Sequence, residues 1–176
     1  PIKEEPFLLT RNCRNTRHIH CAAYRYYQGE QTEPPTIIGD EITILAGPSR
    51  GSQVKRLHAH LVDLIDREGV DPEKIAVLVP SVGHREYYDA LEGRPLPHGA
   101  KWAIEQYGIE GGVRVDTVRR FKGLEATVIY LWGVDTFDPK CDVELLYVTL
   151  SRAKSLLLLV GDGKRCESIL NGESKA

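Results

Sequence analysis

The sequence predicts an α/β fold in which helices cover both faces of a mainly parallel sheet. Two observations lead to this prediction. Apolar runs such as 75–79 (IAVLV) and 127–132 (TVIYLW) are nearly continuous, which is typical of strands buried on both faces. Amphipathic segments with apolar residues at i, i+3, i+4 and i+7 separate these runs, and this alternation is typical of a parallel α/β sheet.

The same patterns place each element along the chain. Strands are expected at 6–10, 42–46, 75–79, 113–118 and 127–132, with a last one ending at Gly161. Helices are expected at 51–68, 84–91, 98–107 and 162–171, and over the stripe of Val143, Leu146, Tyr147, Leu150 and Ala153. A first helix, with Asn15 or Thr16 as its N-cap, should bury Ile19, Ala22, Ala23, Tyr26 and Tyr27. Residues 28–41, which contain two prolines, are expected to form an exposed loop.

Composition bounds the class of protein. The 176 residues suffice for one domain with a substantial core. A net charge of -2 argues against a globally basic nucleic-acid binder, and no apolar run approaches the ~20 residues of a membrane span. The four cysteines form no CxxC pair, so neither a disulfide framework nor a metal site is expected, and a cytoplasmic location fits best. The chain starts at Pro1 and lacks methionine, so a fragment of a longer protein is expected.

Two groups of arginines suggest anion binding. On an ideal helix Arg152 points away from the core stripe and is flanked by Leu145 and Val148, an arrangement that suits a guanidinium held toward a phosphate or carboxylate. The alternative is an ordinary surface arginine. Arg11, Arg14 and Arg17 crowd the start of the first helix, where an anion could offset their charge; Glu4 or Glu5 could also pair with them. Because RNCRNT (11–16) and RRFKGLE (119–125) both follow strand ends, both are expected at the carboxyl rim of the sheet.

Three segments resemble motifs of one family. TVRRFKGLE (117–125), LLYVTLSRAK (145–154) and RNCRNT (11–16) resemble motifs V, VI and IV of UvrD/Rep-type superfamily 1 DNA helicases. The resemblance implies that the chain is the C-terminal, second RecA-like domain of such an enzyme, a three-layer sandwich. It also implies that Arg14 and Arg152 act as arginine fingers on the γ-phosphate of ATP.

The resemblance assigns further contacts. Glu125 would accept a hydrogen bond from the ATP ribose, although it could instead pair with Lys122 or Arg120, and Gly123 would allow close backbone approach to the nucleotide. Thr117, Arg119 and Arg120 would contact the phosphates of single-stranded DNA; a basic pair of this kind is otherwise an ordinary solvated surface.

Two departures from the family stand out. Cys13 occupies the position of the tyrosine that stacks on adenine in the family, and a thiol offers no comparable flat surface. The short connection at 92–112 has no room for the helical subdomain that many members insert there, so the resemblance supports movement along a single strand rather than strand separation.

No Walker A (GxxxxGKS/T) or Walker B motif occurs in the sequence. The β-phosphate and Mg²⁺ should therefore be held by an N-terminal RecA-like partner domain, and this chain alone is expected not to hydrolyse ATP. One alternative is a catalytically inactive RecA-like module that binds a partner or nucleic acid. Another is an independent flavodoxin-like enzyme, which would share the sheet class but would lack a phosphate loop or acid/base group here.

Overall fold

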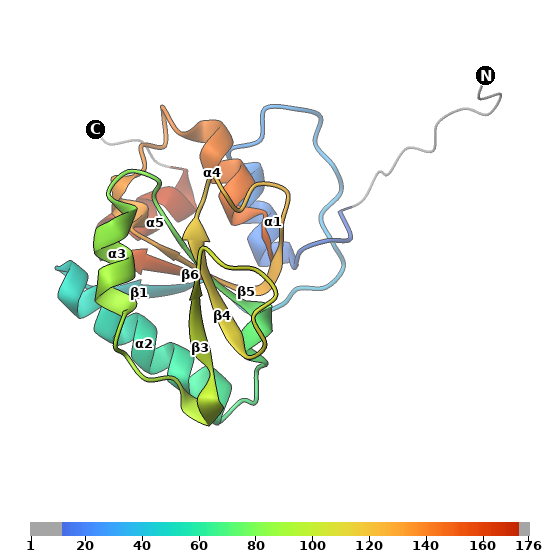
Figure 1. The fold of residues 1–176 in the computed structure, drawn as a ribbon. Helices are drawn as coiled ribbons and strands as arrows, with labels where there is room; N and C mark the ends of the chain where they lie inside the picture. The colour runs from blue at the N-terminus through green and yellow to red at the C-terminus, as the bar shows by residue number, and fades with distance from the viewer. Residues whose placement is uncertain (1–11, 173–176) are drawn as a thin grey trace, which may run out of the picture.

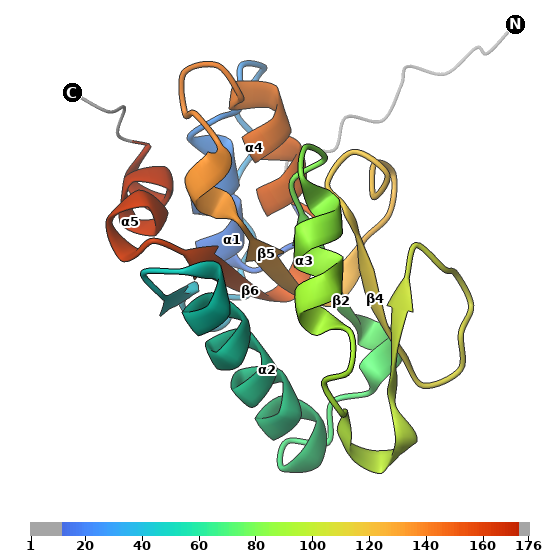
Figure 2. The ribbon, with the colours of Figure 1, turned by 60° about the vertical axis from the view of Figure 1, so that its left-hand side comes forward.

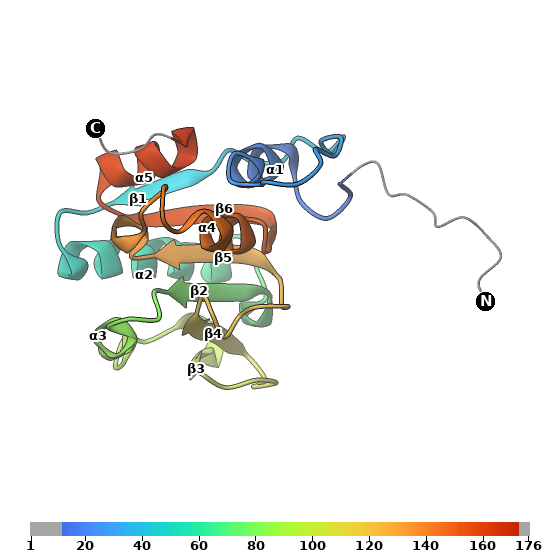
Figure 3. The same cartoon turned by 90° about the horizontal axis from the view of Figure 1, so that it is seen from above.

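The computed structural model describes residues 12–172 and contains one six-stranded sheet. The strands are β1 (Thr43–Ala46), β2 (Ile75–Val79), β3 (Lys101–Ile104), β4 (Gly112–Thr117), β5 (Ala126–Trp132) and β6 (Ala153–Gly161). Their order is β1-β6-β5-β2-β4-β3, and each neighbouring pair is parallel (Figure 3). The predicted α/β class with a parallel sheet is confirmed.

Helices cover both faces of this sheet. On one face lie α1 (Arg17–Tyr24), α4 (Val143–Leu150) and α5 (Gly163–Asn171); on the other lie α2 (Arg50–Asp66) and α3 (His84–Leu91) (Figures 1 and 2). Three short 3₁₀ turns, Pro72–Lys74, Pro97–Gly99 and Val134–Thr136, complete the elements within the described residues. The result is a three-layer arrangement of helices, sheet and helices.

The central strands are buried on both sides, which explains their continuous apolar sequences. All five residues of β2 are buried, and successive side chains enter opposite cores. Leu78 joins the core formed with α1, α4 and α5, whereas Val77 and Val79 join the core formed with α2 and α3. Both faces therefore gain from hydrophobic burial, at roughly 25 cal/mol per Å² of apolar surface.

The helix predicted at 98–107 is wrong, because the structure has strand β3 there. His98 and Gly99 have φ values of 54° and 74°, which end any helix at its start. Residues 101–104 then pair with β4, and Trp102 and Ile104 pack against the core on the α2/α3 face. Alanine, glutamate and glutamine in this segment favour a helix, but pairing and burial override that weak preference. The connection 105–111 then turns back directly into β4.

Two expected helices also end earlier than predicted. The helix expected to carry Arg152 ends at Leu150, and Ser151 and Arg152 form the turn into β6. Helix α1 ends at Tyr24, although Tyr26 beyond it is buried as expected. The strand predicted at 6–10 lies outside the described residues.

The loop 28–41 lies over the beginning of α1. Most of its residues are exposed, but Thr32 is partly buried and Pro35 is buried. The Asn12 N–H donates to the Glu33 carbonyl, and the Arg17 side chain donates to the Pro35 carbonyl, so the loop forms a wall beside the start of the helix. Among the described helices, none has the length and apolar character needed to cross a bilayer.

Candidate functional site

The first candidate site forms where β5 and β6 begin. Ala126 of β5 pairs with Ala153 of β6, and the residues just before them are Glu125 and Arg152. The Ala126 N–H donates to the Arg152 carbonyl at 3.2 Å, so the backbone fixes Glu125 and Arg152 as cross-strand neighbours. The position of Arg152 therefore depends on strand pairing rather than on a helix.

Arg14 reaches the same place through a side-chain clamp. The buried Asn15 amide donates to the carbonyls of Ser151 (2.8 Å) and Ala153 (2.5 Å), one on each side of Arg152. Arg14 then places its Nε 2.9 Å from the Glu125 carboxylate, and Lys154 forms a second ion pair with that carboxylate. We call Arg14, Glu125, Arg152 and Lys154 the amino-end cluster, because they lie at the amino ends of β5 and β6.

The charged side chains of this cluster differ in how fully hydrogen bonds and ion pairs satisfy them. Arg14 and Glu125 are exposed by 40% and 38% of their side chains, so water screens their ion pair. Arg152 is partly buried, and its Nε is buried without a hydrogen-bond partner. Burial, followed by the nearby Arg14 charge, lowers the pKa of Arg152, whereas Lys154 and then Arg14 lower the pKa of Glu125. An anion beside Arg14 and Arg152 would offset the repulsion between their two charges.

The sequence-based alternatives for these residues are only partly right. Glu125 does pair with cations, but the cations are Arg14 and Lys154 rather than Lys122 or Arg120. The partner of Arg14 is Glu125, and Glu4 and Glu5 lie outside the described residues. Arg11 lies outside them as well.

The second candidate site lies at the carboxyl end of β4, where Thr117 ends the strand. Arg14 of motif IV lies instead at the amino ends of β5 and β6. The prediction that motifs IV and V share one carboxyl rim is therefore wrong. The segment 118–125 starts at the carboxyl end of β4 and runs back to the amino end of β5, so only its last residue, Glu125, meets Arg14. Thr117 and Glu125 belong to one motif but lie at opposite ends of the sheet.

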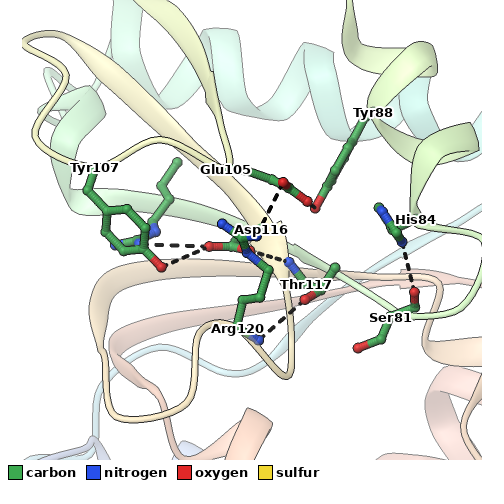
Figure 4. A network of polar contacts seen from close by, with 9 residues as sticks. Ser81, His84, Tyr88, Glu105, Tyr107, Asp116, Thr117 and Arg120 are labelled. Atoms are coloured by element: carbon green, nitrogen blue, oxygen red, sulfur yellow. Dashed lines mark hydrogen bonds and ion pairs between the residues drawn. The ribbon is translucent and has the colours of Figure 1, made fainter.

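Arg120 forms intramolecular ion pairs at this second site, although 47% of its side chain is exposed. Its Nε lies 3.0 Å from the Asp116 carboxylate and its Nη1 lies 3.3 Å from that of Glu105 (Figure 4). The Thr117 hydroxyl is buried and accepts the Arg120 N–H at 3.3 Å. The structure thus uses Thr117 and Arg120 to hold the start of the loop.

The sequence reasoning missed Asp116, the centre of this network. Asp116 is fully buried and accepts hydrogen bonds from the Thr117 N–H (2.8 Å) and the Tyr107 hydroxyl (3.4 Å). Arg114 lies 3.7 Å from the same carboxylate and 3.6 Å from the Tyr107 ring centre. We call Glu105, Tyr107, Arg114, Asp116 and Arg120 the carboxyl-end network. The sequence feature that could have identified Asp116 is a carboxylate within the otherwise apolar strand VRVDT.

Arg119 and Lys122 remain exposed and line a different cavity, of about 470 Å³. Leu145 and Val148 of α4 line its opposite side, so these apolar residues accompany the basic loop rather than form a rim specific to Arg152. Gly123 follows in this loop with φ of 88°, a conformation that other residues rarely adopt.

Comparison with known proteins addresses the resemblance directly. Residues 112–160 match the UvrD-like helicase C-terminal domain. The UvrD-like segment runs from β4 to the end of β6 and so contains Thr117 to Glu125 and Arg152, whereas Arg14 precedes it. The resemblance read from these motifs is confirmed over that segment.

A solved structure extends the likeness to the whole fold. The C-terminal domain of a possible DNA helicase from Lactobacillus plantarum WCFS1 superimposes with a TM-score of 0.65 and 22% sequence identity. The match covers 85% of this chain and 87% of that one, so the two share the α/β fold outside the UvrD-like segment as well. No curated protein matches the sequence.

Proposed function

We propose that this chain is the second RecA-like domain of an ATP-driven DNA helicase or translocase. In this role Arg14 and Arg152 face the γ-phosphate of ATP bound by an N-terminal RecA-like domain that also holds Mg²⁺. The observation that carries the proposal is the convergence of these two arginines, which are far apart in sequence, with a buried Arg152 Nε that has no partner. The UvrD-like match and the helicase domain of the same fold support it.

The amino-end cluster suits a phosphate chemically. ATP supplies the phosphoryl group, and a rigid guanidinium beside it stabilises the charge that grows on its oxygens in the transition state. The Asn15 bonds hold the backbone on both sides of Arg152, so the backbone that carries this guanidinium needs little ordering on binding. Arg14 is held only by an exposed ion pair, which a phosphate can displace at small cost.

Single-stranded DNA is the proposed polymer partner, and the basic loop after β4 is the proposed contact. Arg119 and Lys122 are exposed there, and phosphate contacts by such side chains do not depend on sequence. Arg120 and Thr117 would act mainly by holding this loop in place, since both are engaged within the carboxyl-end network.

The test is an Arg152→Ala substitution in the full-length protein. Removal of an arginine finger is expected to lower the ATPase rate by at least ~100-fold. Arg152→Lys should recover little, because an ammonium does not reproduce the planar fork. Arg67→Ala is the matched control: its side chain is 78% exposed on the opposite face and pairs with Asp63. Near-normal ATP turnover in Arg152→Ala would rule the proposal out.

One observation favours a second candidate, an inactive RecA-like module. Cys13 lines the cavity beside Arg14 and offers no ring at the position where the family carries tyrosine. This candidate predicts no ATPase activity even when the N-terminal region is present, so the wild-type assay separates the two.

A further inference from the structure

A cavity of about 440 Å³ lies directly beside the amino-end cluster. Segments from three parts of the chain line it: residues 12–15, Thr32 of the loop over α1, and Tyr147 and Ser151 at α4. Tyr24 of α1 completes the lining. The volume is within the usual range of about 300–1,000 Å³ for small-molecule sites.

Aromatic rings gather on one side of this cavity. The Tyr147 ring lies 4.7 Å from that of Tyr27 and 5.8 Å from that of Tyr24, and Tyr24 stacks on His20 at 3.9 Å. Tyr24 and Tyr147 are only partly buried, so ring surface remains available in the cavity. Flat apolar surface of this kind suits a planar heterocycle.

Hydrogen bonds hold this aromatic wall in place before any ligand arrives. The Thr32 hydroxyl donates to the Tyr24 oxygen at 2.8 Å, and the Asn12 amide donates to the His20 ring at 2.9 Å. Asn12 also accepts the Arg14 N–H at 2.8 Å, so one side chain connects the rings to the arginine segment. A preorganised wall lowers the ordering cost of binding.

The cavity therefore joins two kinds of recognition. Arg14 lines it together with Tyr24 and Tyr147, and Ser151 places it one residue from Arg152, so arginine side chains and aromatic rings occur at the same cavity. A nucleotide has this combination of groups, a charged phosphate chain and a flat base. A base of the DNA strand fits less well, because the exposed cations Arg119 and Lys122 line a separate cavity.

We infer that the base of the bound nucleotide packs against Tyr147 and Tyr24, which take over the stacking role that Cys13 cannot fill. The inference rests on the proposed function, since it assumes that Arg14 and Arg152 hold the phosphates of the same ligand. Tyr147 and Tyr24 thereby become binding residues of the site, and the loop 28–41 contributes through Thr32.

The experiment compares ATP with inorganic triphosphate, which lacks the base, by calorimetric titration of the full-length protein. Tyr147→Leu removes the ring and should weaken ATP binding by about fivefold or more, as expected for loss of a base–aromatic stack. Triphosphate binding should not change. Tyr147→Phe keeps the ring and should bind ATP within about twofold of the wild type. Arg152→Ala should weaken both ligands.

The outcomes separate the two inferences. If Arg152→Ala weakens both ligands while Tyr147→Leu and Tyr24→Leu weaken neither, the base pocket is wrong and the arginine role stands. If Tyr147→Leu weakens ATP alone and Arg152→Ala changes nothing, the pocket stands and the arginine role fails. Failure of the wild type to bind either ligand overturns both.

A second measurement does not depend on any substitution. Photolabelling of the wild-type protein with 8-azido-ATP, followed by mass spectrometry, should mark peptides that contain Tyr24 or Tyr147. Labelling confined to other parts of the chain would overturn the base pocket.

Discussion

The two ends of the sheet treat their charges in opposite ways. At the amino ends of β5 and β6, Arg14 is held by an exposed ion pair, and Arg152 has a buried donor without a partner. At the carboxyl end of β4, the fully buried Asp116 is surrounded by Arg114, Arg120 and Tyr107. At the carboxyl end of β4, Arg114 and Arg120 both lie beside the Asp116 carboxylate, whereas at the amino ends Arg152 has no carboxylate partner of its own among the described residues.

From this difference we expect that Arg120 positions the loop rather than contacting a ligand. Arg120 belongs to motif V, but its guanidinium is shared between Asp116 and Glu105. Charge that is satisfied internally fixes the loop, whereas charge left unsatisfied at the surface is free to bind. Substitutions of Asp116, Arg119, Arg120 and Glu125 test this distinction, and one of His60 tests how burial shapes the response to pH, from the largest expected effect to the smallest.

Asp116→Ala should cost most stability, about 3 kcal/mol of unfolding free energy, because it leaves the partly buried Arg114 without its carboxylate and the buried Thr117 N–H without its acceptor. Denaturant unfolding measures the change. Asp40→Ala, at an exposed loop position, serves as the control and should change stability by less than about 0.5 kcal/mol. A loss of less than about 1 kcal/mol in Asp116→Ala would mean that the network is not tightly held.

Arg119→Ala and Arg120→Ala should differ in DNA binding by the full-length protein. Arg119 is exposed and, as a direct phosphate contact, its loss should weaken binding and reduce the slope of log affinity against log salt by about 0.7. Arg120→Ala should leave the salt slope nearly unchanged, because that guanidinium already faces two carboxylates. Fluorescence anisotropy with oligo-dT at several salt concentrations distinguishes them. Equal loss of slope in both variants would contradict the distinction.

Stability should fall as the pH drops below about 6.5, the ordinary pKa of histidine. Burial lowers the pKa of His60, whose Nδ1 lies 2.8 Å from the Tyr130 hydroxyl, although Glu68 and Asp63 oppose the shift. The unfolded chain therefore takes up a proton that the folded state resists, and stability present above pH 6.5 is lost on acidification, by at most about 1.4 kcal/mol per pH unit. His20 contributes in the same direction.

His60→Asn removes one of these titrations, so its unfolding free energy should depend less steeply on pH between about 6.5 and 5 than that of the wild type. Thermal or urea unfolding across this range measures the slope. An unchanged slope would mean that titrating groups other than His60 cause the loss of stability in acid.

Glu125→Gln should have the smallest effect on stability, within about 1 kcal/mol, because the pairs it loses are solvent-exposed. Since Lys154 and Arg14 lower the pKa of Glu125, its contribution is present above the ordinary glutamate pKa and fades as the pH falls through the lowered value. A double-mutant cycle with Arg14→Ala measures the coupling. A coupling well above about 1 kcal/mol would show that Arg14 is held too firmly to exchange partners.

Much of the fold could be predicted because local pattern and tertiary packing agree. Strand β2 and helix α3 begin and end where the sequence predicts, since a continuous apolar run and an amphipathic turn leave no alternative. Strand β3 was missed because it is short and rich in helix-forming residues, and only its partner β4 makes it a strand.

The site could be predicted only in part, for a different reason. The resemblance to motifs IV, V and VI identified Arg14, Glu125 and Arg152, which the structure brings together. The partners of these residues could not be predicted, because they depend on which strand ends meet. The sequence did not predict that Asp116 is the centre of a polar network or that Tyr147 joins a group of aromatic rings. Their neighbours come from other elements.

The double hydrogen bond of Asn15 has one more consequence. Because the Asn15 amide bonds the backbone on both sides of Arg152, and Asn15 directly follows Arg14, the fold sets the spacing between the backbones of the two arginines. Opening and closing around a nucleotide would then require the whole domain to move as a rigid body. Asn15 would then matter for that movement because it joins the two arginine segments.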